Sequence, residues 1–367
     1  MEYSVVSLFS GCGGLDLGFK NSGFELIWAN EIDIDAAATY KKFIHKNINI
    51  GDILENISLV PKSDIVIGGP PCQSFSLVGK RLIDDPRSRL VFTYLEIISK
   101  LKPKVFLMEN VPGICSSMYN NMRLIEYLMN EFSKIGYIVN ILKLNAVDFY
   151  VPQKRKRIFL LGSRILNKKF KLISSEEYSG KILGFKNQTK PVSCIDALGD
   201  LPSPSNEKDV LLKYKNCILS EYAKKMRGKS NTVVSLHSVP TMSEKDKLFA
   251  QYIAPGGNYK NIPDEISTKR IMAFKRTGGR TTTYGRLHPD RPAYTINTYF
   301  NRPNVGANYH YDEERLITPR EGLRLQSFPD YFTPIFNSQR SLYRQIGNSV
   351  PPLLAQALAE SIKLMLK

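Results

Sequence analysis

The chain has 367 residues, of which 43% are hydrophobic and 23% charged, with 51 Lys and Arg against 34 Asp and Glu. Enough apolar side chains are present to bury a core, which excludes disorder and fibrous structure. No apolar run approaches the roughly 18 residues of a membrane helix, and no basic stretch typical of a signal peptide follows Met1. We therefore expect a cytoplasmic protein of about two domains.

The first 165 residues alternate short β-branched runs with longer amphipathic segments. This pattern is typical of a parallel α/β sheet with helices on both faces. Strands are predicted at 4–9, 25–29, 64–67, 105–108, 137–142 and 157–162. Helices are predicted at 15–21, 35–45, 90–101 and 122–135.

From about residue 186 to 312 the alternation stops, and Lys, Thr, Asn, Gly and Pro become frequent. We interpret this region as a smaller, loop-rich domain. Helices return at 318–325 and 352–366, and the apolar face of the second predicts that it packs on the first sheet. The predicted domains are therefore residues 1–185, completed by 313–367, and residues 186–312.

The positive charge is concentrated in the middle of the chain. Residues 154–302 hold 29 basic and 12 acidic side chains, whereas residues 1–153 hold 15 and 16, and residues 303–367 hold 7 and 6. A local excess of this kind favours a polyanion, above all nucleic acid, as the partner. A Lys-rich solvated surface is the alternative, and charge alone does not decide between them.

A glycine-rich turn that contains Gly11 and Gly13 follows the first predicted strand and opens a helix. Glu31 comes about 20 residues after Gly11, where a carboxylate can accept both hydroxyls of a ribose. Asp52 ends a third extended stretch and is a candidate acceptor for an adenine amino group. All of them fall at the carboxyl edge of the predicted sheet, where ligands bind. For Glu31 or Asp52 taken singly, helix capping is the alternative.

Two further strand ends carry reactive groups. Cys72 follows two prolines after the strand at 64–67, and such a stiff loop suits a nucleophile held for attack. A small buried hydrophobe is the alternative for a lone cysteine. Glu109 ends a wholly apolar strand, so we expect partly desolvated surroundings that favour proton donation near neutral pH.

Long polar side chains precede the strand at 157–162. Strand alternation would place Gln153, Arg155 and Arg157 on one face, which we interpret as pointing into an active cleft. The 5 cysteines are spaced neither as a disulfide framework nor as zinc ligands, so no metal is predicted. None of the 4 histidines lies in a motif, which leaves a Cys-His hydrolase without local support.

Six motifs in one order resemble those of DNA cytosine-5 methyltransferases of the bacterial restriction-modification type. They are the glycine turn, the loop 70–73, residues 109–111, the run 153–157, residues 291–296 and residues 345–351. The resemblance implies a doubly wound, Rossmann-like sheet that binds S-adenosylmethionine, with a smaller target recognition domain that reads DNA. It also implies methyl transfer to carbon 5 of a flipped-out cytosine in a specific duplex sequence, through a covalent bond from Cys72 to carbon 6.

The resemblance assigns a role to each matching position. Cys72 is the nucleophile, Glu109 holds and protonates ring nitrogen 3, and Arg155 and Arg157 complete the catalytic set. The implied cofactor pocket consists of Phe9, Gly11, Gly13, Glu31, Ile32, Asp52, Ile53, Leu90, Asn348 and Ser349. The implied DNA contacts are Lys80 and Arg81 in the loop 76–89, Gln153, and Arg280 and Arg286, with Arg276, Arg302, Tyr284 and Thr281–Thr283 as further candidates.

Alternatives remain open at this point. An RNA cytosine-5 methyltransferase would have the same motif order, and a catalytically silent DNA-binding protein could keep the same fold. An NAD-dependent dehydrogenase would use the same glycine turn, but it leaves Cys72 and the basic region unexplained. We expect a monomer that acts on double-stranded DNA away from membranes, releases S-adenosylhomocysteine and needs no metal. A cognate restriction endonuclease that acts separately is left open.

Overall fold

The computed structural model describes residues 3–71, 89–165, 170–185, 190–208, 210–228 and 232–367. The chain forms two compact units. Unit 1 comprises Met1–Asn145, Lys156–Ser174 and Leu354–Lys367, and unit 2 comprises Ala146–Arg155 and Ser175–Leu353. This is a division by packing, and the functional division predicted from the sequence stays a prediction.

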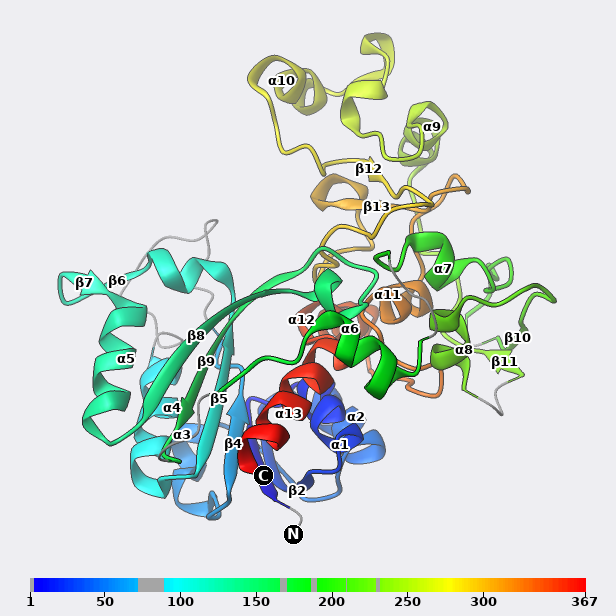
Figure 1. Cartoon of the computed structure of the whole chain (residues 1–367). Coiled ribbons are helices and arrows are strands. Elements are labelled where there is room, and N and C mark those ends of the chain that lie inside the picture. Colours follow the sequence, from blue (N-terminus) through cyan, green and yellow to red (C-terminus); the bar gives the residue numbers. More distant parts are fainter. Residues whose placement is uncertain (1–2, 72–88, 166–169, 186–189, 209, 229–231) are drawn as a thin grey trace. The chain divides into compact units, whose positions relative to one another are not determined.

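Unit 1 is built on a seven-stranded sheet with the order β3-β2-β1-β4-β5-β9-β8 (Figure 1). Its strands are β1 (Ser4–Leu8), β2 (Glu25–Glu31), β3 (Ile48–Ile50), β4 (Ile65–Gly68), β5 (Val105–Asn110), β8 (Ile138–Asn145) and β9 (Lys156–Ser163). The predicted α/β fold class is confirmed. The three-residue strand β3 belongs to the extended stretch expected before Asp52, but its bounds were not predicted, because so short a run has no periodicity of its own.

Strand β9 runs antiparallel to both of its neighbours, whereas the other pairs of the sheet are parallel. The sequence predicts β8 and β9 as strands but not this reversal. A parallel return needs a crossover of about a dozen residues or more, usually with a helix. Residues 146–155 form a shorter connection, and the chain therefore comes back along the sheet in the opposite direction.

Helices cover both faces of this sheet. They are α1 (Gly14–Asn21), α2 (Ile34–Phe43), α3 (Ile53–Asn56), α4 (Arg89–Leu101), α5 (Leu124–Lys134) and α13 (Pro352–Leu366), with short turns η1 (Ile57–Leu59) and η4 (Pro112–Ser116) and a hairpin of β6 (Met118–Tyr119) and β7 (Met122–Arg123). Helices α4 and α5 lie on the face opposite to α1, α2 and α13 (Figure 1).

The core of unit 1 is apolar and aromatic. The ring of Phe106 on β5 lies 4.2 Å from that of Phe132 on α5 and 5.0 Å from that of Tyr137, between centroids. On the other face, the Nζ of Lys363 in α13 donates a hydrogen bond of 2.7 Å to the carbonyl of Ser22, directly after α1. The prediction that residues 352–366 return to the first sheet is confirmed.

The strand order places a topological switch point in the middle of the sheet. From β1 the chain proceeds to β2 and β3 on one side, while β4 and β5 extend on the other. Ligands of open α/β sheets bind in the crevice at the carboxyl ends of the two strands where the order reverses. Here the glycine turn follows β1 and the segment Gly69–Pro71 follows β4.

Unit 2 contains short helices joined by long loops. Its helices are α6 (Ser175–Glu177), α7 (Cys194–Leu198), α8 (Glu221–Arg227), α9 (Glu244–Tyr252), α10 (Lys269–Thr277), α11 (Pro319–Leu325) and α12 (Gln339–Asn348). Its strands are β10 (Leu212–Lys213), β11 (Val233–Val234), β12 (Gly285–Arg286) and β13 (Ala307–Tyr309), and its further turns are η5 (Ala146–Phe149), η6 (Tyr178–Leu183), η7 (Tyr259–Asn261), η8 (Asp264–Ile266) and η9 (Pro303–Val305). The loop-rich prediction overlooked α7 to α10, although serine and threonine caps mark their beginnings: Ser193, Ser220, Ser243 and Thr268.

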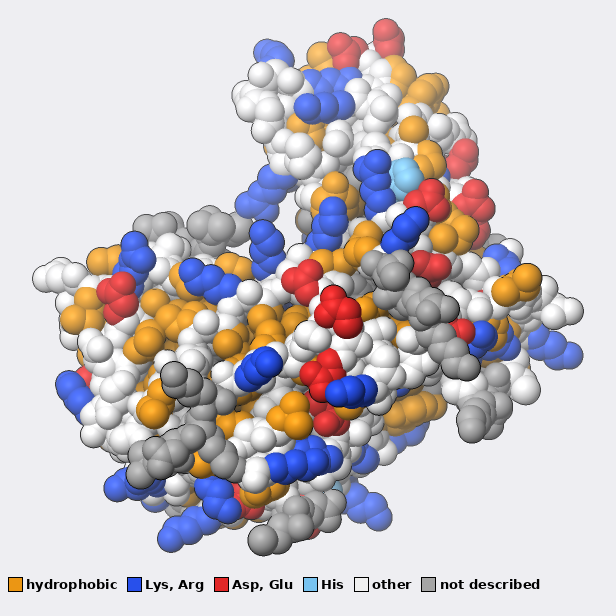
Figure 2. Space-filling view, in the orientation of Figure 1, with side chains coloured by type: hydrophobic (Ala, Val, Ile, Leu, Met, Phe, Trp, Pro, Cys, Tyr) orange, Lys and Arg blue, Asp and Glu red, His pale blue; other side chains and the backbone are white. Residues whose placement is uncertain are grey.

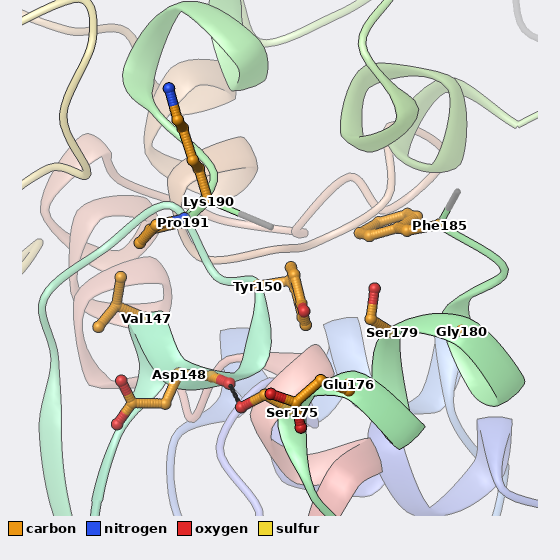
Figure 3. A pocket seen from close by; sticks show the side chains of 10 residues that line it. All are labelled: Val147, Asp148, Tyr150, Ser175, Glu176, Ser179, Gly180, Phe185, Lys190 and Pro191. Atoms are coloured by element: carbon orange, nitrogen blue, oxygen red, sulfur yellow. Dashed lines mark hydrogen bonds between the residues drawn. The ribbon is translucent and has the colours of Figure 1, made fainter. Parts of the chain in front are cut away.

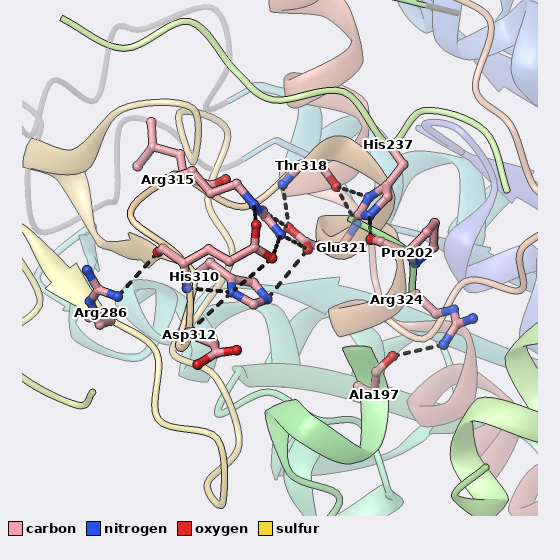
Figure 4. Close-up of polar contacts among 12 residues, drawn as sticks. Ala197, Pro202, His237, Arg286, His310, Asp312, Arg315, Thr318, Glu321 and Arg324 are labelled. Carbon is pink, nitrogen blue, oxygen red and sulfur yellow. Dashed lines mark hydrogen bonds and ion pairs between the residues drawn. The ribbon is translucent and has the colours of Figure 1, made fainter. Parts of the chain in front are cut away.

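Buried ionic groups hold these loops together (Figure 4). The guanidinium of Arg315 donates to both carboxylate oxygens of Glu321, at 2.8 and 2.9 Å, and to Glu313 at 2.9 Å. Burial alone would raise the pKa of Glu321, but the charge of Arg315 outweighs it and holds that pKa well below its usual range. The ring of His237 bridges the hydroxyl of Thr318 and the carbonyl of Pro202, each at 2.8 Å.

Candidate active site

The glycine turn after β1 adopts a left-handed backbone. Phe9, Gly11 and Gly13 have φ angles of 55°, 56° and 90°. A Cβ at Gly13 would lie 2.4 Å from a side-chain carbon of Ile44, so only glycine fits there. Positive φ is uncommon for a residue such as Phe9, and such conformations cluster at ligand sites. This conformation indicates a turn that binds a ligand, and not only a connection between β1 and α1.

Glu31 at the end of β2 is bonded to this turn. Its Oε2 accepts a hydrogen bond of 2.7 Å from the backbone N–H of Gly11, and its Oε1 accepts one of 2.9 Å from that of Asp33. Burial raises the pKa of Glu31 against the effect of these bonds. Each carboxylate oxygen has a second lone pair, so the group can still accept from a ligand. The structure thus brings the predicted residues Gly11 and Glu31 together.

The neighbouring predicted residues have mixed settings. Ile32 is 65% exposed, although it is apolar, whereas Ile53 is 1% exposed. The Oδ1 of Asp52 accepts from the backbone N–H of Leu54 at 3.0 Å and caps α3, which is the capping role weighed for it above. Phe9 and Leu90 are partly buried and pack against the core of unit 1.

These residues fit a nucleoside. A Cβ added at Gly11 would meet nothing within 4 Å, so open space lies before the turn. A carboxylate suited to ribose hydroxyls and an exposed isoleucine suited to a base face stand beside it. An adenosine-containing cofactor would find both kinds of contact here.

Glu109 and Arg157 form a mostly buried ion pair. The Nε of Arg157 lies 2.7 Å from the Oε1 of Glu109, and their side chains are 12% and 14% exposed. Burial lowers the pKa of Arg157, while the charge of Glu109 opposes that shift. A Cβ at Gly69 would lie 3.1 Å from the Oε2 of Glu109, so the glycine after β4 lets the loop approach this carboxylate closely.

Asn110 received no role in the sequence analysis beyond its place in a motif. Its side chain is buried, its Nδ2 donates to the carbonyl of Pro70 at 3.2 Å, and its Oδ1 accepts from the backbone N–H of Val111 at 2.9 Å. It therefore holds the segment that leads toward residue 72. Cys72, Lys80 and Arg81 themselves lie outside the described residues.

Gln153 and Arg155 belong to unit 2 and are fully buried there. Arg155 donates to the carbonyls of Ile296 at 2.9 Å and Gly347 at 2.8 Å. Gln153 donates to the carbonyl of Leu325 at 3.0 Å and accepts from the N–H of Ile296 at 2.9 Å. Strand β9 begins at Lys156, so the predicted alternation does not extend to these two residues, and both tie distant segments together.

Other predicted residues in unit 2 differ in exposure. Asn348 is exposed at the end of α12, and Ser349 is nearly buried, with its hydroxyl donating to the carbonyl of Gln345 at 2.7 Å. Arg280 is exposed. Arg286 is buried, and its guanidinium donates to the backbone carbonyls of Ala250 and Glu313.

A pocket of about 500 Å³ in unit 2 has a different character (Figure 3). Tyr150 and Phe185 supply its aromatic walls, and Asp148, Glu176 and Lys190 supply its charged groups. None of the predicted site residues that the structure describes lines it, and its carboxylates disfavour a polyanion.

Geometry and comparisons with known proteins agree on the class. The sheet order, the glycine turn after β1 and the carboxylate at the end of β2 are consistent with the S-adenosylmethionine-dependent methyltransferase fold, and the chain is structurally similar to a solved DNA methyltransferase. The family model of C-5 cytosine-specific DNA methylases matches residues 3–364. The chain belongs to this family and is a DNA (cytosine-5-)-methyltransferase.

Relatives support this assignment along the whole chain. The Type II methyltransferase M.DdeI of Desulfomicrobium norvegicum is 34% identical over 391 residues, which cover 98% of this chain and 88% of the relative. M.NgoFVII of Neisseria gonorrhoeae is 32% identical over 365 residues, covering 98% and 86%. Both relatives are named as Type II methyltransferases.

Solved structures agree with the fold. A protein described as a DNA modification methyltransferase encoded within an E. coli prophage has a TM-score of 0.74 at 27% identity, with 100% of this chain and 99% of that chain covered. The Dnmt2 methyltransferase of S. pombe, at 18% identity and a TM-score of 0.62 over 100% and 98% of the two chains, shows the fold alone. Among the described residues, no helix is long and apolar enough to span a membrane.

Proposed function

We propose that this enzyme methylates carbon 5 of a cytosine flipped out of a specific duplex DNA sequence, through a covalent bond between Cys72 and carbon 6. The observation that carries the proposal is the buried ion pair between Glu109 and Arg157. Gly69, in the segment that leads to Cys72, lies beside this pair. The ion pair lies at the edge of the sheet formed by the carboxyl ends of β1 and β4, where the glycine turn also lies.

The chemistry explains why these groups are needed. Carbon 5 of cytosine is a poor nucleophile, so Cys72 first adds its thiolate to carbon 6 while Glu109 binds or protonates nitrogen 3. The ring then has enamine character, and carbon 5 can form a bond to a methyl group. S-adenosylmethionine, when bound, supplies that methyl group as an electrophile. A base removes the proton on carbon 5, and breaking the bond between sulfur and carbon 6 restores the aromatic ring and the Cys72 thiolate.

Neither carbon atom is reachable within a stacked duplex, so the target base must leave the helix. Unstacking costs a few kcal/mol, which new contacts in the enzyme offset. Arg157 orients the Glu109 carboxylate through their 2.7 Å pair, and Asn110 holds the carbonyl of Pro70, which precedes the proposed nucleophile by two residues in the chain.

The cofactor pocket is proposed to be built around the glycine turn of unit 1. Glu31 would bind the ribose hydroxyls, Ile32 would cover an adenine face, and the turn at Gly11 would accommodate the rest of the cofactor. Asp52, Ile53, Phe9 and Leu90 would complete its walls. From their sequence motif, cofactor contacts are also proposed for Asn348 and Ser349.

DNA contact is proposed for the basic region at 186–312 and for Lys80 and Arg81. Lys and Arg side chains lie on the surface over α10 and β12 (Figure 2), and Lys269, Arg276 and Arg280 are exposed there. Gln153 and Arg286 are bonded inside unit 2, so we propose that they support DNA-binding segments and do not touch DNA themselves. The enzyme is proposed to act as a monomer, and protection of host DNA is its proposed role.

Transfer of labelled methyl to a mixed-sequence duplex, followed by nucleoside analysis, tests the reaction. Wild type is expected to place label in 5-methylcytosine, and Cys72→Ser and Glu109→Gln to place little or none. Cys217→Ser removes an exposed cysteine and serves as the matched control with unchanged activity. Label in structured RNA but not in duplex DNA would overturn the proposed substrate.

The covalent step has its own test. A duplex with 5-fluorocytosine at the target position cannot lose a proton from carbon 5, so the adduct should persist. Mass spectrometry should then find the modified base on the peptide that contains Cys72. A modified base on another cysteine, or none while methyl transfer to the normal duplex proceeds, would contradict the proposed nucleophile.

A further inference from the structure

A polar pocket of about 380 Å³ lies in the part of unit 2 that contains α9, β12 and β13. Thr241, Asp246, Asn301, Arg302 and Asn304 give it a mostly polar lining, and Tyr284 adds an aromatic wall. Tyr284 has a φ of 50°, which is uncommon for a bulky residue and marks a constrained backbone at the wall.

The loop 301–304 at this pocket is held by its backbone. The N–H of Arg302 donates to the carbonyl of Tyr299 at 2.9 Å, and the carbonyl of Arg302 accepts from the side chain of Asn308 at 2.7 Å. The carbonyl of Pro303 accepts from the N–H of Tyr284 at 2.8 Å. The guanidinium of Arg302 lies over the Tyr299 ring, 5.1 Å from its centroid. The loop therefore presents its side chains from a preorganised backbone.

The lining is suited to partners that both donate and accept hydrogen bonds. Arg302 only donates, Asp246 accepts, and the amides of Asn301 and Asn304 do both. A phosphodiester offers only acceptors, and the carboxylate of Asp246 repels it. The edges of base pairs in the major groove offer donors and acceptors together.

We propose that the loop 301–304 reads base edges of the duplex and is a determinant of the methylated sequence. A guanidinium such as that of Arg302 can bind a guanine through two hydrogen bonds, and an amide such as that of Asn301 or Asn304 can bind an adenine in the same way. The exposed cations of α10, Lys269 and Arg276, have no carboxylate in their helix and suit phosphates instead. This inference rests on the proposed action on duplex DNA.

The test uses the full-length enzyme and a duplex library with randomised base pairs around a fixed cytosine. Sequencing after chemical conversion of unmethylated cytosine gives the preference of wild type, Arg302→Ala, Asn301→Ala and Asn304→Ala. We expect each pocket variant to relax the preference at one position, with discrimination falling roughly 10- to 100-fold. Arg302→Lys should also relax it, because an ammonium cannot form the two-bond contact.

Two controls distinguish a loss of base recognition from a loss of folding or of positive charge. Lys247→Gln removes an exposed cation of α9 that pairs with Glu244 at 2.7 Å, and its preference should equal that of wild type. Thermal melting and binding of S-adenosylmethionine should be close to wild type for the pocket variants, since their side chains lie at the surface of unit 2.

An equal loss on all sequences for Arg302→Ala would assign the loop to phosphate contact and overturn the inference. An unchanged preference in all pocket variants would overturn it too, while the proposed function would stand as long as wild type methylates duplex DNA. A wild-type enzyme that transfers no methyl to any duplex would overturn the proposed function and this inference together.

Discussion

The two units satisfy their buried polar groups in different ways. In unit 1, seven strands pair their backbone groups, and the largest buried side chains include Phe19, Phe106, Phe132 and Tyr94. In unit 2, strands have two or three residues, and the largest buried side chains include Arg155, Arg320 and Arg324. Loops without ladders leave carbonyls unpaired, and arginine supplies five donors from one side chain. A loop-built unit thus uses side chains where a sheet uses its backbone.

The largest expected effect is loss of Arg324. Its guanidinium binds Asp200 at 2.9 Å and Asp330 at 2.6 Å, and all three side chains are at most 2% exposed. Arg324→Ala would remove the nearest cation from two buried carboxylates and leave them only the more distant Arg227 and Arg320, at 3.8 and 3.7 Å, which should destabilise unit 2 by about 3–5 kcal/mol. Trp28, the single tryptophan, lies in the core of unit 1 and reports on that unit alone. In urea, circular dichroism should show a larger shift of the midpoint than Trp28 fluorescence. Equal shifts would mean that the units unfold as one.

Phe106→Ala is the matching change in unit 1. Removing this fully buried ring leaves a cavity between Phe132 and Tyr137 and should cost about 3–5 kcal/mol. Here the Trp28 transition should move to lower urea at least as far as the circular dichroism signal. A Trp28 transition that stays in place would contradict the assignment of this ring to the same cooperative core.

The pH dependence should have opposite signs in the two units. Burial raises the pKa of Asp16 in unit 1 to about 6, so its protonated form is favoured in the folded state and it costs about 3 kcal/mol above pH 6. Stability of unit 1 should therefore rise as pH falls from 6 toward 4, and Asp16→Asn should abolish that rise. Glu321 in unit 2 has a lowered pKa, so its contribution is present above about pH 4.5 and is lost as pH falls below it. Urea midpoints are to be measured by Trp28 fluorescence and by circular dichroism between about pH 3 and 7. If the assignment is wrong, both midpoints will change with pH in the same direction.

Arg155→Lys is a milder test of the arginine cross-links. Lysine cannot reach the carbonyls of Ile296 and Gly347 together, and Gly347 directly precedes the proposed cofactor residues Asn348 and Ser349. We expect the KM for S-adenosylmethionine to rise about 10-fold while kcat stays nearly unchanged. A change of this size in KM corresponds to the free energy of one hydrogen bond to a charged group. A fall in kcat at constant KM would instead favour direct participation of Arg155 in the chemistry.

The smallest effect is expected at the surface. Lys181→Gln removes an ion pair of 2.9 Å with Glu177, and the side chains are 73% and 39% exposed. Such pairs contribute up to about 0.5 kcal/mol to stability, so the urea midpoint of the variant should lie close to that of wild type. The small difference between the two midpoints should shrink as the salt concentration rises. A larger loss would show that exposed pairs matter more to unit 2 than its buried arginines suggest.

The strand ends of unit 1 were predictable because their pattern is local. The apolar runs predict the strands. The residues at their ends, Glu31, Glu109 and the glycine turn, indicate the chemistry at the strand ends. The reversal of β9 was not predictable, since alternation reveals a strand but never its direction. Helix α12 was missed although Ser338 caps it and Leu342 and Ile346 share its buried face, because the intervening polar residues obscured the period.

The roles of Gln153 and Arg155 were beyond sequence reasoning for another reason. Their partners, Ile296, Leu325 and Gly347, are more than 140 residues away in the chain, and all of these bonds end on backbone groups. A backbone carbonyl leaves no mark in the amino-acid pattern. The same holds for Asn110, whose partner is the carbonyl of Pro70.

The contact between α1 and α13 can form only after almost the whole chain has been synthesised. About 330 residues separate these helices, and the intervening chain includes nearly all of unit 2. At roughly 5–20 residues per second, a ribosome needs on the order of 20–70 s to make that stretch. Throughout this time the surface of α1 that later receives α13 stays uncovered on the nascent chain, so unit 2 can fold before unit 1 is complete. Chaperones that bind exposed apolar helices would find their substrate in this interval.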